Sequence, residues 1–209
     1  MDTLPNQLPV MLLAFVMLVV VFPLLRFRWR TGRSALVVRA SGGPVERFVR
    51  AWLVTLSAAL GVWSVLVKTV GTARLGIWPV PAPVSALGAA LVALGALLVV
   101  IAQAQMGKSW RIGIDDAPTA LVTSGLYRHI RHPIYTGILT ALAGLACIAP
   151  GAFSAGAWLL MYFLVAIQCR LEDGHMAHQH GAGFFSWAAH TGRLLPGLGR
   201  LRSSGARQA

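Results

Sequence analysis

Residues 134–168 decide the fold, and they read IYTGILTALAGLACIAPGAFSAGAWLLMYFLVAIQ without a single charged side chain. The apolar run 152–168 has the length that crosses a bilayer as a helix, and the run 134–149 is slightly shorter. Pro150-Gly151 between them is a turn signal. Because this link is so short, the two helices must form an antiparallel hairpin. The sequence therefore predicts a helical hairpin within a membrane.

Three further apolar runs precede the hairpin, namely Leu8–Leu25, Ala51–Val67 and Val84–Met106. We therefore expect an all-α, polytopic membrane bundle of about five transmembrane helices. It would form a single domain over residues 1–202, followed by a disordered tail over 203–209. The third run contains Gly88 and Gly95, which would let a neighbouring helix approach closely. The first run has arginines after it rather than before it, which favours a retained span over a cleaved signal peptide.

Composition supports a membrane protein, because 56% of residues are hydrophobic and 11% are charged. A soluble domain carries about 25% charged residues. The formal net charge of +12 is explained by basic loops that face anionic lipid headgroups. We expect no nucleic-acid partner, because no basic face interleaved with aromatic residues is evident outside those loops.

The basic residues also predict an orientation. Sixteen of the eighteen lysines and arginines lie in residues 26–50, in residues 107–133 or in the C-terminal tail. The positive-inside rule then places the N-terminus outside and the C-terminus in the cytoplasm. Only Lys68 and Lys108 are lysines, an arginine bias typical of GC-rich bacterial genomes. We therefore expect a multi-pass protein of a bacterial inner membrane.

Two polar segments on the expected cytoplasmic side hold the candidate functional residues. The first, 107–133, ends in the basic run 128–133 (RHIRHP), directly before a predicted helix. The helix dipole disfavours positive charge at that position, so an anionic ligand or acidic partners are expected there. The second segment offers the acidic pair Glu172 and Asp173. Gln168, Glu172, His175 and Gln179 recur at helical spacing, so they share one face if the last span continues as a helix.

Purely structural roles for these residues stay open at this point. His132-Pro133 would serve as the start of a helix, flanked by interfacial arginine and tyrosine anchors. Glu172 would form a salt bridge with an arginine. A metal site is not expected, because the spacing of His175, His178 and His180 does not place all three on one helical face. The sequence also lacks a nucleophile elbow, a paired-histidine zinc motif and a phosphate-binding loop.

Residues 121–137 (LVTSGLYRHIRHPIYTG), followed by the hairpin and Glu172-Asp173, resemble the isoprenylcysteine carboxyl methyltransferase family. This family lies within a wider group that includes phospholipid methyltransferases. The resemblance covers roughly residues 106–196. In the family, the tail usually reads Glu-Glu, then Phe-Gly, two spaced tyrosines and a closing proline. The matching positions here are Glu172-Asp173, His180-Gly181, Phe184, Trp187 and Pro196, while His180 and Gly192 depart from a usual Phe and Pro.

The resemblance implies S-adenosyl-L-methionine as cofactor, bound in a cytoplasmic pocket formed by the 107–133 loop and the C-terminal helical tail. His132 and Glu172 would be the catalytic residues. Glu172 would meet the cationic sulfonium or amino group, and Arg131 and His132 would meet the cofactor carboxylate. Methyl transfer of this kind needs a dry, aligned site and no metal. The implied cofactor-binding residues are Thr119, Ala120, Leu121, Val122, Tyr127, Arg131, His132, Pro133, Ile134, Tyr135 and Glu172.

By the same resemblance, the methyl acceptor would be a membrane lipid or lipidated substrate, most like an isoprenylcysteine carboxyl group. The family often has arginine four residues before the first glutamate, where it meets an acceptor carboxylate. Gln168 stands at that position here, and the nearby Arg170 points to another face of a regular helix. We expect both residues to be substrate-binding. A lipid amine, a thiol or another amphiphile therefore stays open as acceptor.

Two alternatives of other classes also stay open. Sterol-reductase-like enzymes that use NADPH look similar around the His-Pro motif, although they have more spans. A non-catalytic membrane scaffold would use the same helices without a cofactor.

Overall fold

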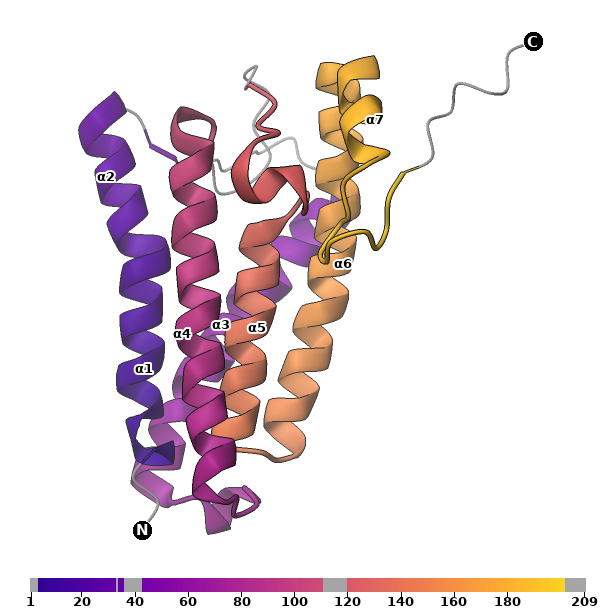
Figure 1. Cartoon of the computed structure of the whole chain (residues 1–209). Coiled ribbons are helices and arrows are strands. Elements are labelled where there is room, and N and C mark those ends of the chain that lie inside the picture. Colours follow the sequence, from indigo (N-terminus) through magenta and orange to yellow (C-terminus); the bar gives the residue numbers. More distant parts are fainter. Residues whose placement is uncertain (1–3, 33, 36–42, 111–119, 202–209) are drawn as a thin grey trace.

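The computed structural model describes residues 4–32, 34–35, 43–110 and 120–201, and the regular elements in these ranges are all helices (Figure 1). One isolated parallel bridge, Ile130 to Gly192, is the only β pairing in this part of the chain. The expected all-α bundle is confirmed. The elements are η1 (Pro5–Gln7), α1 (Leu8–Val16), η2 (Met17–Val21), α2 (Phe22–Thr31), α3 (Pro44–Val70), η3 (Ala73–Leu75), α4 (Ala82–Met106), η4 (Gly107–Ser109), η5 (Gly125–Arg128), α5 (Pro133–Ile148), α6 (Ala152–His180) and α7 (Ala182–Ala188).

Four helical stretches of the described chain are long and apolar enough to cross a membrane, and α5 is a shorter apolar helix. The four are Pro5–Thr31, Pro44–Val70, Ala82–Met106 and Ala152–His180. These helices contain the five apolar runs that the sequence predicts, and most of them extend beyond those runs. Residues 26–50 are not a loop throughout, because α2 continues to Thr31 and α3 begins at Pro44. The predicted tail over 203–209 lies outside the described residues.

The first span continues as a helix through Pro23, which lies near the end of the predicted run Leu8–Leu25. Proline has no N–H, so the carbonyl of Val19, four residues earlier, loses its ordinary helical donor. At this point the helix widens into the π-helical turn η2, and the Gln103 side-chain amide donates to the Val19 carbonyl at 2.8 Å. An unsatisfied carbonyl costs several kcal/mol in hydrocarbon. The bond from α4 therefore explains how this helix tolerates proline.

Helices α4 and α5 are antiparallel and make the closest helix contact in the bundle (Figure 1). Gly88 lies opposite Gly144, and Gly95 lies opposite Gly137. A Cβ atom built on Gly88 would lie 2.7 Å from the Gly144 carbonyl oxygen, and one built on Gly137 would lie 2.6 Å from that of Gly95. The predicted close approach at Gly88 and Gly95 is confirmed. This contact fixes α5, whose first turn carries site residues.

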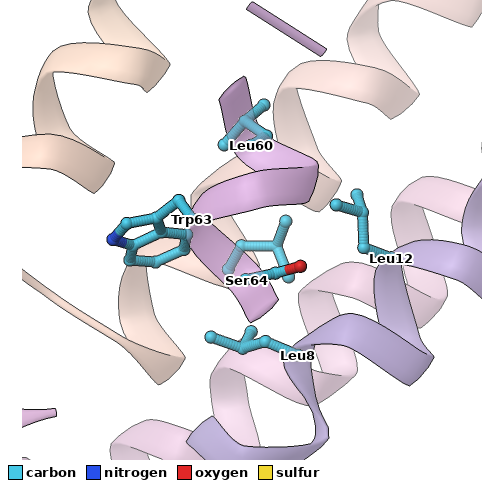
Figure 2. A pocket seen from close by; sticks show the side chains of 6 residues that line it. Leu8, Leu12, Leu60, Trp63 and Ser64 are labelled. Atoms are coloured by element: carbon cyan, nitrogen blue, oxygen red, sulfur yellow. The ribbon is translucent and has the colours of Figure 1, made fainter. Parts of the chain in front are cut away.

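The remaining helices close the bundle around this pair. The long helix α3 crosses behind α4 and α5 in Figure 1, and it contacts α1 and α6. The α5–α6 hairpin has the predicted tight link. Figure 2 shows a small apolar gap where α1 and α3 meet, lined by leucines, Trp63 and Ser64. The Ser64 hydroxyl donates to the Gly61 carbonyl of its own helix at 2.7 Å, so this gap contains no unsatisfied hydroxyl.

The glycine contact predicts that Gly137→Ala destabilises the protein. The added methyl group has no space against α4, and overpacking of this kind costs about 1–3 kcal/mol. Gly61→Ala is the matched control, because a Cβ on Gly61 meets nothing within 4 Å. Thermal unfolding of both variants in detergent checks this. Equal melting temperatures for Gly137→Ala and wild type would contradict the tight contact.

Candidate functional site

The described polar residues of the two segments that hold the candidate functional residues meet at one end of the bundle, the upper end in Figure 1. Helix α6 runs without a break from its apolar part to His180, as the helical spacing of Gln168 and Glu172 requires. Helix α5 begins at Pro133, directly after His132, so proline occupies the first helical turn. The site residues therefore stand on two rigid helices of one hairpin.

Arg131 is the most connected residue of the site, and only 3% of it is exposed. Its Nε and Nη2 groups donate to the two carboxylate oxygens of Asp173 at 3.2 and 3.3 Å. Its Nη1 group donates to the carbonyls of Ala188 and Thr191, and Nη2 also donates to that of Gly199 at 2.8 Å. A guanidinium has five N–H donors, and all five are used. Arg131 therefore joins α6 to α7 and to the segment that follows α7.

Backbone hydrogen bonds also join the residues directly before α5 to the segment that follows α7. The Arg131 N–H donates to the Gly192 carbonyl at 2.8 Å, and the Gly192 N–H donates to the His129 carbonyl at 3.1 Å. The His132 N–H donates to the Arg193 carbonyl at 3.1 Å. Gly192 stands where the resembled family usually has proline, and proline could not donate this bond. The glycine at position 192, in place of the usual proline, therefore allows the hydrogen bond to His129.

Glu172 faces the space between α5 and α6, and 28% of its side chain is exposed. Its Oε1 atom accepts hydrogen bonds from the Tyr135 hydroxyl at 2.6 Å and from the Gln168 amide at 2.9 Å. Its Oε2 atom lies 3.3 Å from Nδ1 of His132. Among the described residues, no arginine pairs with Glu172. The salt bridge between Glu172 and an arginine, which the sequence left open, is therefore not formed in this part of the chain. Two neutral donors and His132 hold this carboxylate, and part of it stays accessible.

His132 lies between the two acidic side chains. Its Nε2 atom is 2.9 Å from Oδ1 of Asp173, and its Nδ1 atom faces Glu172. Burial disfavours the charged imidazolium, but the hydrogen bonds to both carboxylates and their negative charges outweigh burial, so the pKa of His132 is raised. Nε of Arg193 adds a bond to Oδ2 of Asp173 at 3.1 Å. The positive charge before α5 thus has the acidic partners that the sequence analysis expected.

Tyr127 closes the site from the side of η5. Its buried hydroxyl donates to the Ala102 carbonyl at 3.4 Å, and the Trp187 indole donates to the Tyr127 carbonyl at 2.9 Å. Phe184 of α7 is also buried, with its ring 6.0 Å from that of Trp187. Burial, and next the charge of Glu172, raise the pKa of Tyr127 above its ordinary value, so this phenol stays neutral.

The remaining predicted cofactor-binding residues belong to the segment before η5 and to the first turn of α5. Ala120, Leu121 and Val122 lie in a segment without regular secondary structure before η5, with Ala120 exposed, and Thr119 lies outside the described residues. Pro133 is buried. Ile134 packs against the cluster of Phe27, Ala35 and Trp110.

Of the two predicted substrate residues, Gln168 bonds to Glu172 in the site, whereas Arg170 is exposed. Within the described residues, no group of histidine, cysteine and acidic side chains is arranged to hold a metal ion.

The sequence analysis missed the part played by Asp173 and Arg193. It treated Asp173 as the neighbour of Glu172, whereas the Asp173 carboxylate pairs with Arg131, His132 and Arg193. Asp173 is also the more buried of the two acids, with 8% of its side chain exposed. A signal was present in the basic run 128–133, which needs counter-charges. The pattern alone did not say which acid supplies them.

The Arg131 network predicts that Arg131→Lys loosens the segment after α7. An ammonium has three donors in place of five and cannot form the two-point bond with Asp173, so we expect a loss of about 2 kcal/mol or more in stability. Arg128→Lys is the control, because Arg128 is exposed. Limited proteolysis and thermal unfolding measure the effect. Wild-type protease resistance in Arg131→Lys would contradict the assigned role.

Comparisons with known proteins agree with this arrangement. A model of the phospholipid methyltransferase family matches residues 84–183, from α4 to the start of α7. No curated protein sequence matches the chain significantly. The solved structure of the eukaryotic intramembrane Ras methyltransferase ICMT (isoprenylcysteine carboxyl methyltransferase) is similar, with a TM-score of 0.58 and 17% identity over 93% of this chain and 68% of that chain.

At this identity the likeness to ICMT shows the fold, and the family model adds the methyltransferase class. The apolar helices and the fold together identify an integral membrane protein. The resemblance found in the sequence is confirmed: residues 84–183 match the phospholipid methyltransferase family, and the chain has the fold of the ICMT structure.

Proposed function

We propose that this chain is an S-adenosyl-L-methionine-dependent methyltransferase that acts on a membrane-embedded amphiphile. The observation that carries the proposal is the Glu172 carboxylate. It is partly exposed, it stands on a membrane helix, and neutral donors and His132 hold it in place. A fixed carboxylate in such a site is complementary to a cationic ligand.

The residues present fit the proposed cofactor. When bound, S-adenosyl-L-methionine supplies a methyl group on a positively charged sulfur. Glu172 would hold the sulfonium or the amino group, while Tyr135 and Gln168 orient the carboxylate through their bonds to Oε1. The two ring nitrogens of His132 face Oε2 of Glu172 and Oδ1 of Asp173, so His132 would hold Glu172 in place and would not itself meet the cofactor carboxylate. Residues 120–122 and the wall formed by Tyr127 would border the remainder of the cofactor.

Arg131 receives a different role in this proposal from the one that the resemblance implies. All five of its donors are bonded within the chain, so a cofactor carboxylate would have to displace one of them. We therefore assign Arg131 as a positioning residue, which holds Asp173 and the terminal segment and thereby fixes His132 and Glu172.

The location of the site supports a lipid or lipidated acceptor. Glu172 stands in the last turns of α6, directly beyond its apolar part, and the lipid-facing residues of α6 include exposed Leu159, Tyr162 and Phe163. An amphiphile in the bilayer could present its polar group at this level. The similar structure is that of an intramembrane Ras methyltransferase, which supports a lipidated protein as one acceptor.

We also propose that the site lies on the cytoplasmic side, with the N-terminus outside. The exposed arginines of α2 and the basic residues around the site lie at the same end of the bundle (Figure 1), as the positive-inside rule requires of a cytoplasmic face.

The experiment that tests the proposal is cofactor binding to purified protein by calorimetry. Wild type is expected to bind S-adenosyl-L-methionine and not NADPH. Glu172→Gln removes the negative charge, so we expect binding to weaken about tenfold or more, which is about 1.4 kcal/mol or more. Glu46→Gln is the control, because Glu46 lies in the first turn of α3 and pairs with Arg50.

Two results would contradict the proposal. If wild type bound neither S-adenosyl-L-methionine nor its demethylated product, the methyltransferase function would be wrong. If Glu172→Gln bound the cofactor as tightly as Glu46→Gln does, the assigned role of Glu172 would be wrong.

A further inference from the structure

We propose that His180 binds the adenosine half of the cofactor through its Nε2 atom. The inference rests on the proposed methyltransferase function and adds a residue to the same site. Among the described residues, two buried side-chain atoms have no hydrogen-bond partner, namely Oε1 of Gln103 and Nε2 of His180. Gln103 has a role within the bundle, where its amide nitrogen bonds to Val19. His180 stands at the end of the bundle that holds the site, so its unsatisfied nitrogen points to a ligand.

The imidazole of His180 is unfavourable in the free protein. A neutral imidazole has one N–H donor and one acceptor nitrogen, so Nε2 takes one of these two roles. A buried polar atom without a partner destabilises the folded chain. The resembled family usually has phenylalanine at this position, which has no polar side-chain atom to satisfy. The ring is partly exposed, so a rotation of the side chain would bring Nε2 to a ligand atom.

The register of α6 places His180 beside the charged network of the site. His180 follows Asp173 by seven residues, about 20° less than two full turns, so both side chains lie on one side of the helix. Arg131 joins Asp173 to the end of α7, so α7 covers this side. Only Gly181 separates the two helices, and its φ of 52° lets the chain turn sharply. His180 therefore lies at the junction where α7 folds back along α6.

The polarity of α6 sets the direction in which the cofactor extends. In the proposed site, Glu172 meets the sulfonium or the amino group, and the adenosine is bonded to that same sulfur. Toward the bilayer, the next buried residues of α6 beyond Gln168 are Val165 and Leu164, where a nucleoside would lose its hydrogen bonds. In the other direction, His180 lies eight residues from Glu172, about 12 Å along the axis. An extended S-adenosyl-L-methionine can bridge this distance.

The elements around this junction form a wall that suits a nucleoside. The Trp187 indole of α7 donates to the Tyr127 carbonyl at 2.9 Å, which fixes α7 against η5. Phe184 is buried in the same short helix. Ligand sites combine apolar and aromatic walls with a few placed polar groups. Here α7 supplies the aromatic rings and His180 supplies the polar atom.

The test uses a fragment that separates the two halves of the cofactor. 5′-Methylthioadenosine keeps the adenosine and its sulfur, but it has no positive charge, amino group or carboxylate. Calorimetry on purified full-length protein measures the binding of this fragment and of S-adenosyl-L-methionine. We expect His180→Phe to weaken both about fivefold, the effect of one lost hydrogen bond. Glu172→Gln should weaken only S-adenosyl-L-methionine. His178→Phe is the matched control, because His178 is exposed and points to another side of α6.

Thermal unfolding supplies a second readout, which separates a binding role from a structural one. His180→Phe removes an unsatisfied nitrogen, so the melting temperature of the free protein should be unchanged or higher, while the rise caused by the cofactor should be smaller. His180→Gln keeps a polar atom near the position of Nε2 and should bind the cofactor more tightly than His180→Phe does.

The outcomes distinguish this inference from the function on which it rests. If wild type binds S-adenosyl-L-methionine and His180→Phe binds it as tightly as His178→Phe does, His180 is not a binding residue. If His180→Phe weakens the cofactor but not the fragment, the assignment to adenosine is wrong. Absence of cofactor binding by wild type would instead overturn the methyltransferase function. If His180→Phe does not fold, His180→Leu removes the same nitrogen and gives the same test.

Discussion

The site depends on the hydrogen bonds and the ion pair that the buried guanidinium of Arg131 forms. A buried arginine is strongly unfavourable unless its charge and its N–H groups have partners, and Arg131 has an acidic partner and three carbonyl partners. These partners come from α6, from the end of α7 and from the segment after it. Because Arg131 and Arg193 are both bound to Asp173, the neighbouring Glu172 keeps only neutral donors and His132. Two adjacent carboxylates thereby acquire different functions, one structural and one accessible to a ligand.

The membrane part of the bundle determines where this pair is held. The glycine contact between α4 and α5 sets the position of α5, and the tight link at Pro150-Gly151 sets α6 against it. Gln103 lets the first span continue past Pro23 by satisfying the Val19 carbonyl, so the bundle keeps a continuous helix beside α4. In lipid, close packing and full hydrogen bonding replace the hydrophobic effect between helices. The same forces that order the spans therefore place His132, Tyr135 and Glu172.

Much of this arrangement could be predicted from the sequence, because its strongest signals are local. Runs without charge identify the five helices, and the i, i+4 spacing of Gln168 and Glu172 places both on one face of α6. The helices extend beyond the predicted apolar runs at Arg26, Ala51 and Gln168, because a search for apolar runs stops at the first polar residue. Helices continue past this point, since long arginine side chains reach the headgroups from a helix. Adjacent residues on a helix point about 100° apart, so the pattern Glu172-Asp173 did not reveal which acid receives Arg131. That choice depends on the carbonyls of Ala188, Thr191 and Gly199, which come from a segment with no regular pattern.

The central claim is that the accessible carboxylate of this hairpin supports methyl transfer to a molecule in the bilayer. The most direct measurement supplies purified protein with a bacterial lipid extract and methyl-labelled S-adenosyl-L-methionine, and follows label into lipid-soluble products by mass spectrometry. The account predicts label in such a product with wild type and its loss with Glu172→Gln. No labelled lipid with wild type, or equal labelling with Glu172→Gln, would contradict it.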